Sequence, residues 1–127
     1  MDLNDLSNTI VGAAIEVHKL VGPGLLESAY EECLCHELVL RGIPFERQKN
    51  LPLVYKQRQL DCGYRLDVVV DNMVVVELKS CDKIESIHKA QLLTYLKLSG
   101  LPLGLLLNFN VPLMKDGIIR MANGIKE

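Results

Sequence analysis

The chain has 127 residues, of which 49% are hydrophobic and 24% are charged, and its formal net charge is −2. This length and composition indicate one globular domain spanning residues 1–127. The charge balance excludes the strongly basic surface that coats many nucleic-acid-binding domains, so any contact with a polyanion must use a local patch. No apolar run approaches the ~20 residues of a membrane span. The polar first ten residues are unlike a signal peptide, and we therefore expect a cytoplasmic protein with no membrane contact.

The predicted elements follow from hydrophobic periodicity and from the residues that end each segment. In chain order they are helices over residues 4–20 and 25–41, two strands within residues 43–60, strands over residues 63–70 and 73–80, a helix over residues 86–99, and strands over residues 101–109 and 117–122. Gly42 and Gly100 are natural C-terminal stops for the second and third helices, and Ser86 is a natural N-cap. A break near residues 50–52 divides the first strand segment in two.

This order, α-α-β-β-β-β-α-β-β, predicts an α/β fold in which a mixed β-sheet is flanked by helices. The segment LPLGLLLNF, residues 101–109, is a continuous apolar run of the kind that is buried on both faces of a sheet. Helices on both sides of the sheet account for such a strand.

Three charged residues interrupt the two valine-rich strands on either side of Asp71 and Asn72. Asp67 lies in the first strand, and Glu77 and Lys79 lie in the second. A two-residue loop would place the two carboxylates on opposite faces of the hairpin, whereas an odd-length loop, for example residues 70–72, places them on the same face. Because the apolar faces of the two strands match only in the second case, we predict an odd-length connection.

Two carboxylates on adjacent strands can share a divalent cation through oxygen ligands, which Mg²⁺ prefers. Lys79, on the face of Glu77, can orient a water nucleophile or offset charge on a phosphoryl transition state. The alternative is an interior Asp/Glu–Lys ion-pair set that only stabilises the sheet, and the spacing favours neither.

Two other polar sets lie on predicted helices. Gln91 and Tyr95 are four residues apart and share a helix face, although an exposed Gln91 and a half-buried Tyr95 would give the same pattern. Glu27 shares an apolar stripe with Tyr30, which predicts that Glu27 points inward. It can equally well serve as a charge that complements the helix N-terminus.

Metal ligation by cysteine is not predicted. The four cysteines form no CxxC pair and the three histidines are scattered, so we expect free thiols that are buried or half-buried, and no zinc site.

Taken together, these residues make the sequence resemble the small bacterial GxxExxY proteins, which are assigned to the PD-(D/E)xK nuclease superfamily. Gly24, Glu27 and Tyr30 match the first motif, and Asp67 with the Glu77-Leu78-Lys79 segment matches the superfamily core. Gln91 and Tyr95 resemble the QxxxY motif of the RecB-like branch. The PD-(D/E)xK pattern has proline directly before its aspartate, whereas this chain has Leu66 at that position.

The resemblance implies a restriction-endonuclease-like core and Mg²⁺-dependent cleavage of phosphodiesters, with Mn²⁺ able to substitute. Asp67 and Glu77 would be metal ligands, and Glu27 a further ligand or an orienter of water. Lys79 would position or activate the nucleophile, and Gln91 and Tyr95 would support the site.

Nucleic acid is the implied partner, with DNA favoured over RNA, and a protein partner or a homodimer is also compatible. A loose group of basic residues near the first strands could form the contact surface: Arg41, Arg47, Lys49, Lys56, Arg58 and Arg65. The alternative is a catalytically inactive nuclease-fold binding module or an accessory subunit of a nucleic-acid-processing complex.

Overall fold

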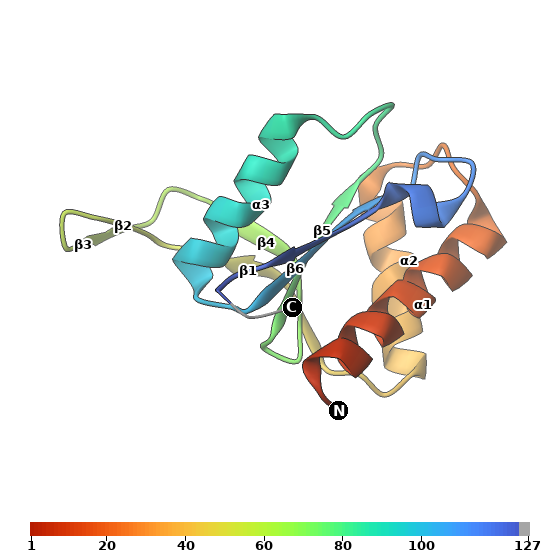
Figure 1. Ribbon diagram of the computed structural model, residues 1–127, viewed down its shortest axis with the longest axis horizontal. Coiled ribbons are helices and arrows are strands. Elements are labelled where there is room, and N and C mark those ends of the chain that lie inside the picture. Colours follow the sequence, from red (N-terminus) through yellow and green to blue (C-terminus); the bar gives the residue numbers. More distant parts are fainter. Residues whose placement is uncertain (125–127) are drawn as a thin grey trace.

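A five-stranded mixed sheet forms the centre of the structure, a computed structural model that describes residues 1–124 of the chain (Figure 1). The strands lie in the order β1-β4-β5-β6-β7. β5 and β6 are parallel, and the other neighbouring pairs are antiparallel. The strands are β1 (Phe45–Asn50), β4 (Arg65–Val70), β5 (Val74–Lys79), β6 (Leu103–Asn108) and β7 (Ile118–Ala122).

Helices cover both faces of this sheet, which confirms the predicted fold class. α1 (Leu3–Val21) and α2 (Glu27–Leu40) lie on one side and α3 (Ser86–Ser99) lies on the other (Figure 1). A short 3-10 helix, η1 (Met114–Gly117), precedes β7. Within residues 1–124, no helix combines the length and the hydrophobicity needed to cross a membrane.

The two faces of the sheet bury separate hydrophobic cores. Val68, Val76 and Leu105 pack with the apolar residues of α1 and α2. On the other face, Val69 and Val75 pack with the apolar residues of α3. All six residues of β6 are buried, as the continuous apolar run predicted.

The segment between β1 and β4 differs from the prediction. Where we expected one strand after the break at residues 50–52, the chain forms a separate two-stranded hairpin of β2 (Leu53–Tyr55) and β3 (Arg58–Leu60). Its turn residues, Lys56 and Gln57, have φ values of 48° and 69°. Hairpin turns of this kind usually carry Asn or Gly, so Lys56 and Gln57 are no turn signal in the sequence. The hairpin projects from the body of the molecule beside α3 (Figure 1).

Two helix starts also differ. α2 begins at Glu27 rather than Leu25. The N-cap of α3 is Glu85 rather than Ser86, in a capping box with His88. The His88 ring accepts the Glu85 N–H at 2.9 Å through Nδ1, which gives this histidine a structural role.

Candidate active site

The β4–β5 hairpin brings Asp67 and Glu77 together. Val68 pairs with Val76 and Val70 with Val74, and continuing this register places Asp67 opposite Glu77. The connection therefore has three residues, 71–73, which confirms the predicted odd length. The loop lies one residue later than our example. Both Asp71 and Asn72 adopt left-handed conformations, with φ values of 50° and 53°.

Each of the two carboxylates accepts a hydrogen bond from the backbone of the opposite strand. The Asp67 N–H donates to Glu77 Oε2 at 2.8 Å, and the Leu78 N–H donates to Asp67 Oδ2 at 3.0 Å. Side-chain oxygens thus take the place of carbonyl acceptors at this end of the β4–β5 ladder. Among residues 1–124, no other N–H group donates a hydrogen bond to either carboxylate.

The pair is electrostatically unfavourable when both acids are ionised. Burial raises the pKa of Glu77 to about 8, and the nearby charge of Asp67 acts in the same direction. A hydrogen bond between the two carboxyl groups, which needs a proton, raises the pKa of Glu77 further. Burial is also the largest cause that raises the pKa of Asp67, and the charges of Glu31 and Glu27 add to it. A proton, or a cation in its place, relieves this repulsion.

The alternation of side chains breaks at Asp67. Val68 belongs to the core under α1 and α2, yet Leu66 packs in the core under α3 together with Val69. Regular alternation along this strand would place Leu66 and Val68 on one face, and the structure shows that this expectation is wrong. On β1, Arg47 pairs with Val68 and Lys49 with Leu66, which leaves Gln48 opposite Asp67 with a φ of 49°. Unusual backbone conformations of non-glycine residues cluster at functional sites, and this one adjoins the acid pair.

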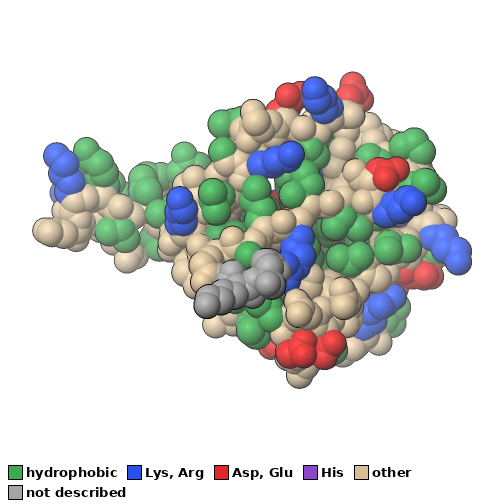
Figure 2. All heavy atoms as spheres, viewed as in Figure 1, with side chains coloured by type: hydrophobic (Ala, Val, Ile, Leu, Met, Phe, Trp, Pro, Cys, Tyr) green, Lys and Arg blue, Asp and Glu red, His purple; other side chains and the backbone are tan. Residues whose placement is uncertain are grey.

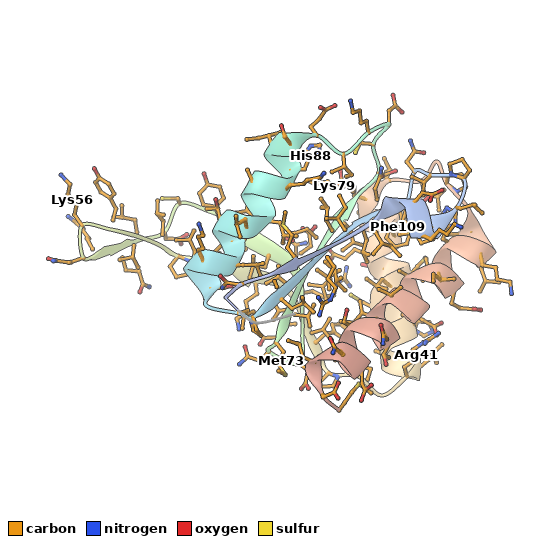
Figure 3. The ribbon with its side chains drawn as sticks, viewed as in Figure 1. Arg41, Lys56, Met73, Lys79, His88 and Phe109 are labelled. Carbon is orange, nitrogen blue, oxygen red and sulfur yellow. The ribbon has the colours of Figure 1, made fainter. Side chains whose placement is uncertain are left out.

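Lys79 lies at the end of β5, where the strand leaves the sheet (Figure 3). Its side chain is half-buried, and its positive charge opposes the rise in the pKa of both Asp67 and Glu77. Yet among residues 1–124 its Nζ has no ion-pair partner within 4.0 Å. A tight structural ion pair with either carboxylate is therefore not formed.

The residues of the GxxExxY pattern shape the loop that precedes α2. Gly24 has a φ of 95°, a conformation that favours glycine. The buried Tyr30 hydroxyl donates to the Gly22 carbonyl at 2.6 Å and accepts the Leu25 N–H at 3.1 Å. The Ser80 hydroxyl donates to the Leu25 carbonyl at 2.6 Å, which ties the loop to the end of β5.

Glu27 follows this loop as the first residue of α2. It is exposed, so the prediction that it points inward with its apolar stripe is wrong, and its position in the first turn fits the alternative of a charge that complements the helix N-terminus. Glu27 lies at the very start of α2, where the stripe is still exposed to solvent. Even so, Glu27 lies close enough for its charge to raise the pKa of Asp67.

Sequence reasoning missed the polar network that surrounds Glu31. This glutamate is only 8% exposed. Arg47 donates to Glu31 Oε2 from Nε at 3.0 Å and from Nη2 at 2.7 Å, and Gln48 donates to Oε1 at 2.7 Å. The network holds Gln48 in place opposite Asp67. The sequence did contain one signal for this network, because Glu31 directly follows Tyr30 on a buried face of the helix.

Gln91 and Tyr95 approach the site from α3. The Gln91 amide donates to Tyr95 Oη at 3.0 Å. Tyr95 is buried and Gln91 is exposed. Burial is the main cause that raises the pKa of Tyr95, and the charge of Glu77 is the next. The two helix residues therefore lie on the side of the sheet that carries Glu77.

Among residues 1–124, no histidine or cysteine joins the acid pair in a group of three or more ligating side chains. His18 Nε2 hydrogen-bonds the Val111 carbonyl at 2.7 Å. All four cysteines are free thiols; three are buried or half-buried, as expected, whereas Cys62 is exposed. Among residues 1–124, no group of three or more histidine, cysteine, aspartate or glutamate side chains is arranged to hold a metal ion.

The donor chemistry of the acid pair nevertheless fits a hard divalent cation. Asp67 and Glu77 offer carboxylate oxygens, which Mg²⁺ and Mn²⁺ prefer. Burial is the largest cause of the raised pKa of both groups, and the positive charge of Lys79 only partly opposes it. A divalent cation bound between the two carboxylates would stabilise their ionised forms.

Comparison with known proteins agrees with this geometry. The family model of the PD-(D/E)XK nuclease superfamily matches residues 4–121, which run from the second residue of α1 to the fourth residue of β7 and include all the site residues described above. Neither curated proteins nor solved structures gave a significant match. Proteins of this superfamily generally use divalent metal ions. Because the match covers nearly the whole chain, this chain belongs to the PD-(D/E)XK nuclease superfamily.

Proposed function

We propose that this protein is a metal-dependent nuclease that hydrolyses phosphodiester bonds of nucleic acid. The observation that carries the proposal is the acid pair of Asp67 and Glu77, joined across two strands and beside a lysine with no close ion-pair partner. Membership of a nuclease superfamily supports nucleic acid as the partner. Gly24, Glu27 and Tyr30 support placement in the GxxExxY branch.

In this proposal Asp67 and Glu77 hold Mg²⁺, or Mn²⁺ in its place. The cation would polarise a phosphoryl oxygen and neutralise charge that develops in the transition state. Glu27, at the exposed end of the loop fixed by Tyr30, would add a carboxylate on the solvent side of the pair.

Lys79 and the two α3 residues have separate roles. The ammonium group of Lys79 would attract the phosphate and orient a water molecule toward it. The hydrogen bond between Gln91 and Tyr95 would fix the Tyr95 hydroxyl beside Glu77. These roles need only the residues' own charge and hydrogen-bonding groups.

One observation favours the alternative of an inactive binding module or an accessory subunit. The described residues assemble no group of three acidic or other ligating side chains, because Glu27 is exposed and joins no such group. DNA rather than RNA as the substrate, a protein partner or homodimer, and a cytoplasmic location stay predictions from the sequence.

Cleavage assays with labelled single-stranded DNA, duplex DNA and RNA test the proposal directly. Wild type should cleave at least one of them with Mg²⁺ or Mn²⁺, and EDTA should stop the reaction. Glu77→Gln and Asp67→Asn should each lower the rate by at least ~100-fold, the order expected for loss of a preorganised electrostatic group.

Glu46→Gln is the matched control, because Glu46 is an exposed glutamate of β1 with a side-chain exposure of 61%. It should cleave at the wild-type rate. Equal rates for wild type and Glu77→Gln, or no cleavage with either metal, would contradict the nuclease proposal and favour the binding module.

A further inference from the structure

A pocket of about 330 Å³ lies between α3 and the base of the β2–β3 hairpin. Its lining includes Leu53, Tyr64, Ile87, Gln91, Thr94 and Tyr95. The volume falls at the small end of the ~300–1,000 Å³ range of ligand pockets, enough for one planar group but not for a duplex. Gln91 and Tyr95 belong both to this pocket and to the candidate active site.

The pocket offers an aromatic ring at its mouth. Tyr64 is 45% exposed, and its ring centroid lies 6.1 Å from that of the buried Tyr95 at an interplanar angle of 58°. Because the two rings are tilted rather than stacked, the Tyr64 ring keeps a face for another planar group. Thr94 and Gln91 supply polar atoms beside it.

The projecting hairpin extends the same surface away from the body. Side chains two residues apart on a strand share a face, so Tyr55 lies on the face of Leu53, which lines the pocket. Arg58 is the cross-strand partner of Tyr55. Tyr55 is 60% exposed, and the Lys56 ammonium lies 5.6 Å from its ring centroid. Figure 2 shows basic and hydrophobic side chains together on this projection.

The structure also shows which of the six loosely grouped basic residues form ion pairs with carboxylates. Arg41 pairs with Glu37, and Lys49 with Glu46. Arg47 pairs with two glutamates of α2. Within the described part of the chain, the three others of that group form no ion pair with a carboxylate: Lys56, Arg58 and Arg65. Two of these lie on the hairpin, with Lys56 at its tip (Figure 3), and Arg65 follows Tyr64 directly.

We infer that this pocket takes an unpaired nucleobase of a single-stranded nucleic acid. The base stacks on Tyr64, while the hairpin holds the adjoining nucleotide through Tyr55 and its phosphates through Lys56 and Arg58. In a duplex the base faces are hidden by stacking, so only a single strand or a splayed end presents a base to Tyr64. The inference rests on the proposed function and names its substrate class.

Binding is measured by fluorescence anisotropy with labelled thymidine oligonucleotides of about 12 residues, a length within the range that one binding module contacts. The full chain is used in EDTA, so that cleavage does not interfere. We expect wild type to bind the single strand more tightly than a duplex of the same length. Tyr64→Ala should weaken single-strand binding by roughly 5-fold to 150-fold, the range for loss of one base–aromatic stack.

Three further variants separate stacking from folding and charge. Tyr64→Phe keeps the ring and should bind as wild type does. Lys56→Ala should weaken binding and reduce its salt dependence, whereas Lys19→Ala, which removes an exposed lysine of α1, should change neither. Circular dichroism spectra of the variants should match that of wild type, because each substitution is at an exposed position.

The outcomes distinguish this inference from the proposed function. Single-strand binding by Tyr64→Ala at the wild-type level, or a wild-type preference for duplex, overturns the base pocket even if metal-dependent cleavage is present. Tyr64-dependent binding without any cleavage supports the pocket and contradicts the nuclease. No nucleic-acid binding at all overturns the pocket.

Discussion

Replacing Glu77 by Gln should stabilise this protein at neutral pH, because the native fold holds Glu77 in a site that disfavours its charge. Glu77 is 7% exposed, and its pKa rises from 4.5 to about 8. A glutamine side chain keeps the shape of the protonated acid. Its oxygen can still accept the Asp67 N–H, which Glu77 Oε2 now accepts at 2.8 Å.

The size and the sign of the effect follow from proton linkage. Because the pKa of Glu77 is higher in the folded than in the unfolded chain, the folded protein binds more protons between pH 4.5 and about 8, and its stability falls as pH rises through this window. A pKa shift of this size lowers the unfolding free energy of wild type by on the order of 5 kcal/mol above pH 8 and by about 3 kcal/mol at pH 7. Glu77→Gln should therefore match wild type near pH 4.5 and exceed its unfolding free energy increasingly up to pH 8.

Urea unfolding of both proteins at several pH values measures this difference curve, without added metal. Glu46→Gln is again the control and should stay within about 0.5 kcal/mol of wild type, as expected for an exposed position. A Glu77→Gln protein that unfolds more easily than wild type at pH 7, or a difference that does not grow with pH, would refute the reasoning. Glu77 would then be a stabilising charge in a structural ion-pair set.

The other predictions concern the metal, the lysine and the tyrosine of the α2 loop. Mn²⁺ at about 100 times its dissociation constant should raise the unfolding free energy of wild type by about 3 kcal/mol. Mn²⁺ should raise the unfolding free energy of Glu77→Gln by less than ~1 kcal/mol, and thermal melts of both proteins measure the difference. Equal stabilisation of both proteins would show that the ion binds at another site. Lys79→Met should lower cleavage by at least ~100-fold yet change stability by less than ~1 kcal/mol, because Nζ has no close ion-pair partner among the described residues. A loss of roughly 3–5 kcal/mol in a urea titration would instead indicate a buried ion pair. Tyr30→Phe should lower the unfolding free energy by about 1–2 kcal/mol, because the hydroxyl hydrogen-bonds both Gly22 and Leu25. The same variant should also slow cleavage, because the loop before Glu27 loses these two bonds. Unchanged stability and cleavage would show that the loop holds its shape without the hydroxyl.

Hydrophobic periodicity predicted the fold class because most segments have a single apolar pattern. The β4–β5 register followed from matching two apolar faces, since a one-residue slip would have buried different side chains. The hairpin at β2 and β3 was missed for the opposite reason. Lys56 and Gln57 adopt left-handed conformations that their chemistry does not favour, and neither strand has a strong apolar face.

The candidate site was predictable where its residues lie on regular elements. Asp67 and Glu77 could be placed opposite each other from the odd-length hairpin connection, although alternation in β4 breaks beside Asp67, and Gln91 and Tyr95 could be placed from helix spacing. Glu27 could not, because it lies at a helix start and its exposure depends on what the neighbouring loop covers. The network of Glu31 with Arg47 and Gln48 joins residues up to 17 positions apart, which no local pattern reports.

The places where local rules fail are concentrated around the acid pair. Alternation breaks between Leu66 and Val68, Gln48 has an unfavourable φ opposite Asp67, and two carboxylates replace the carbonyl acceptors of the ladder. A sheet selected only for stability would keep its valines and its backbone hydrogen bonds here. Each irregularity involves one of the two carboxylates or the backbone beside it. Together they produce a site with excess negative charge. Such a site is unfavourable in the isolated protein and would become favourable if the proposed cation binds there. The metal-dependent stability difference between wild type and Glu77→Gln therefore bears most directly on the proposed function.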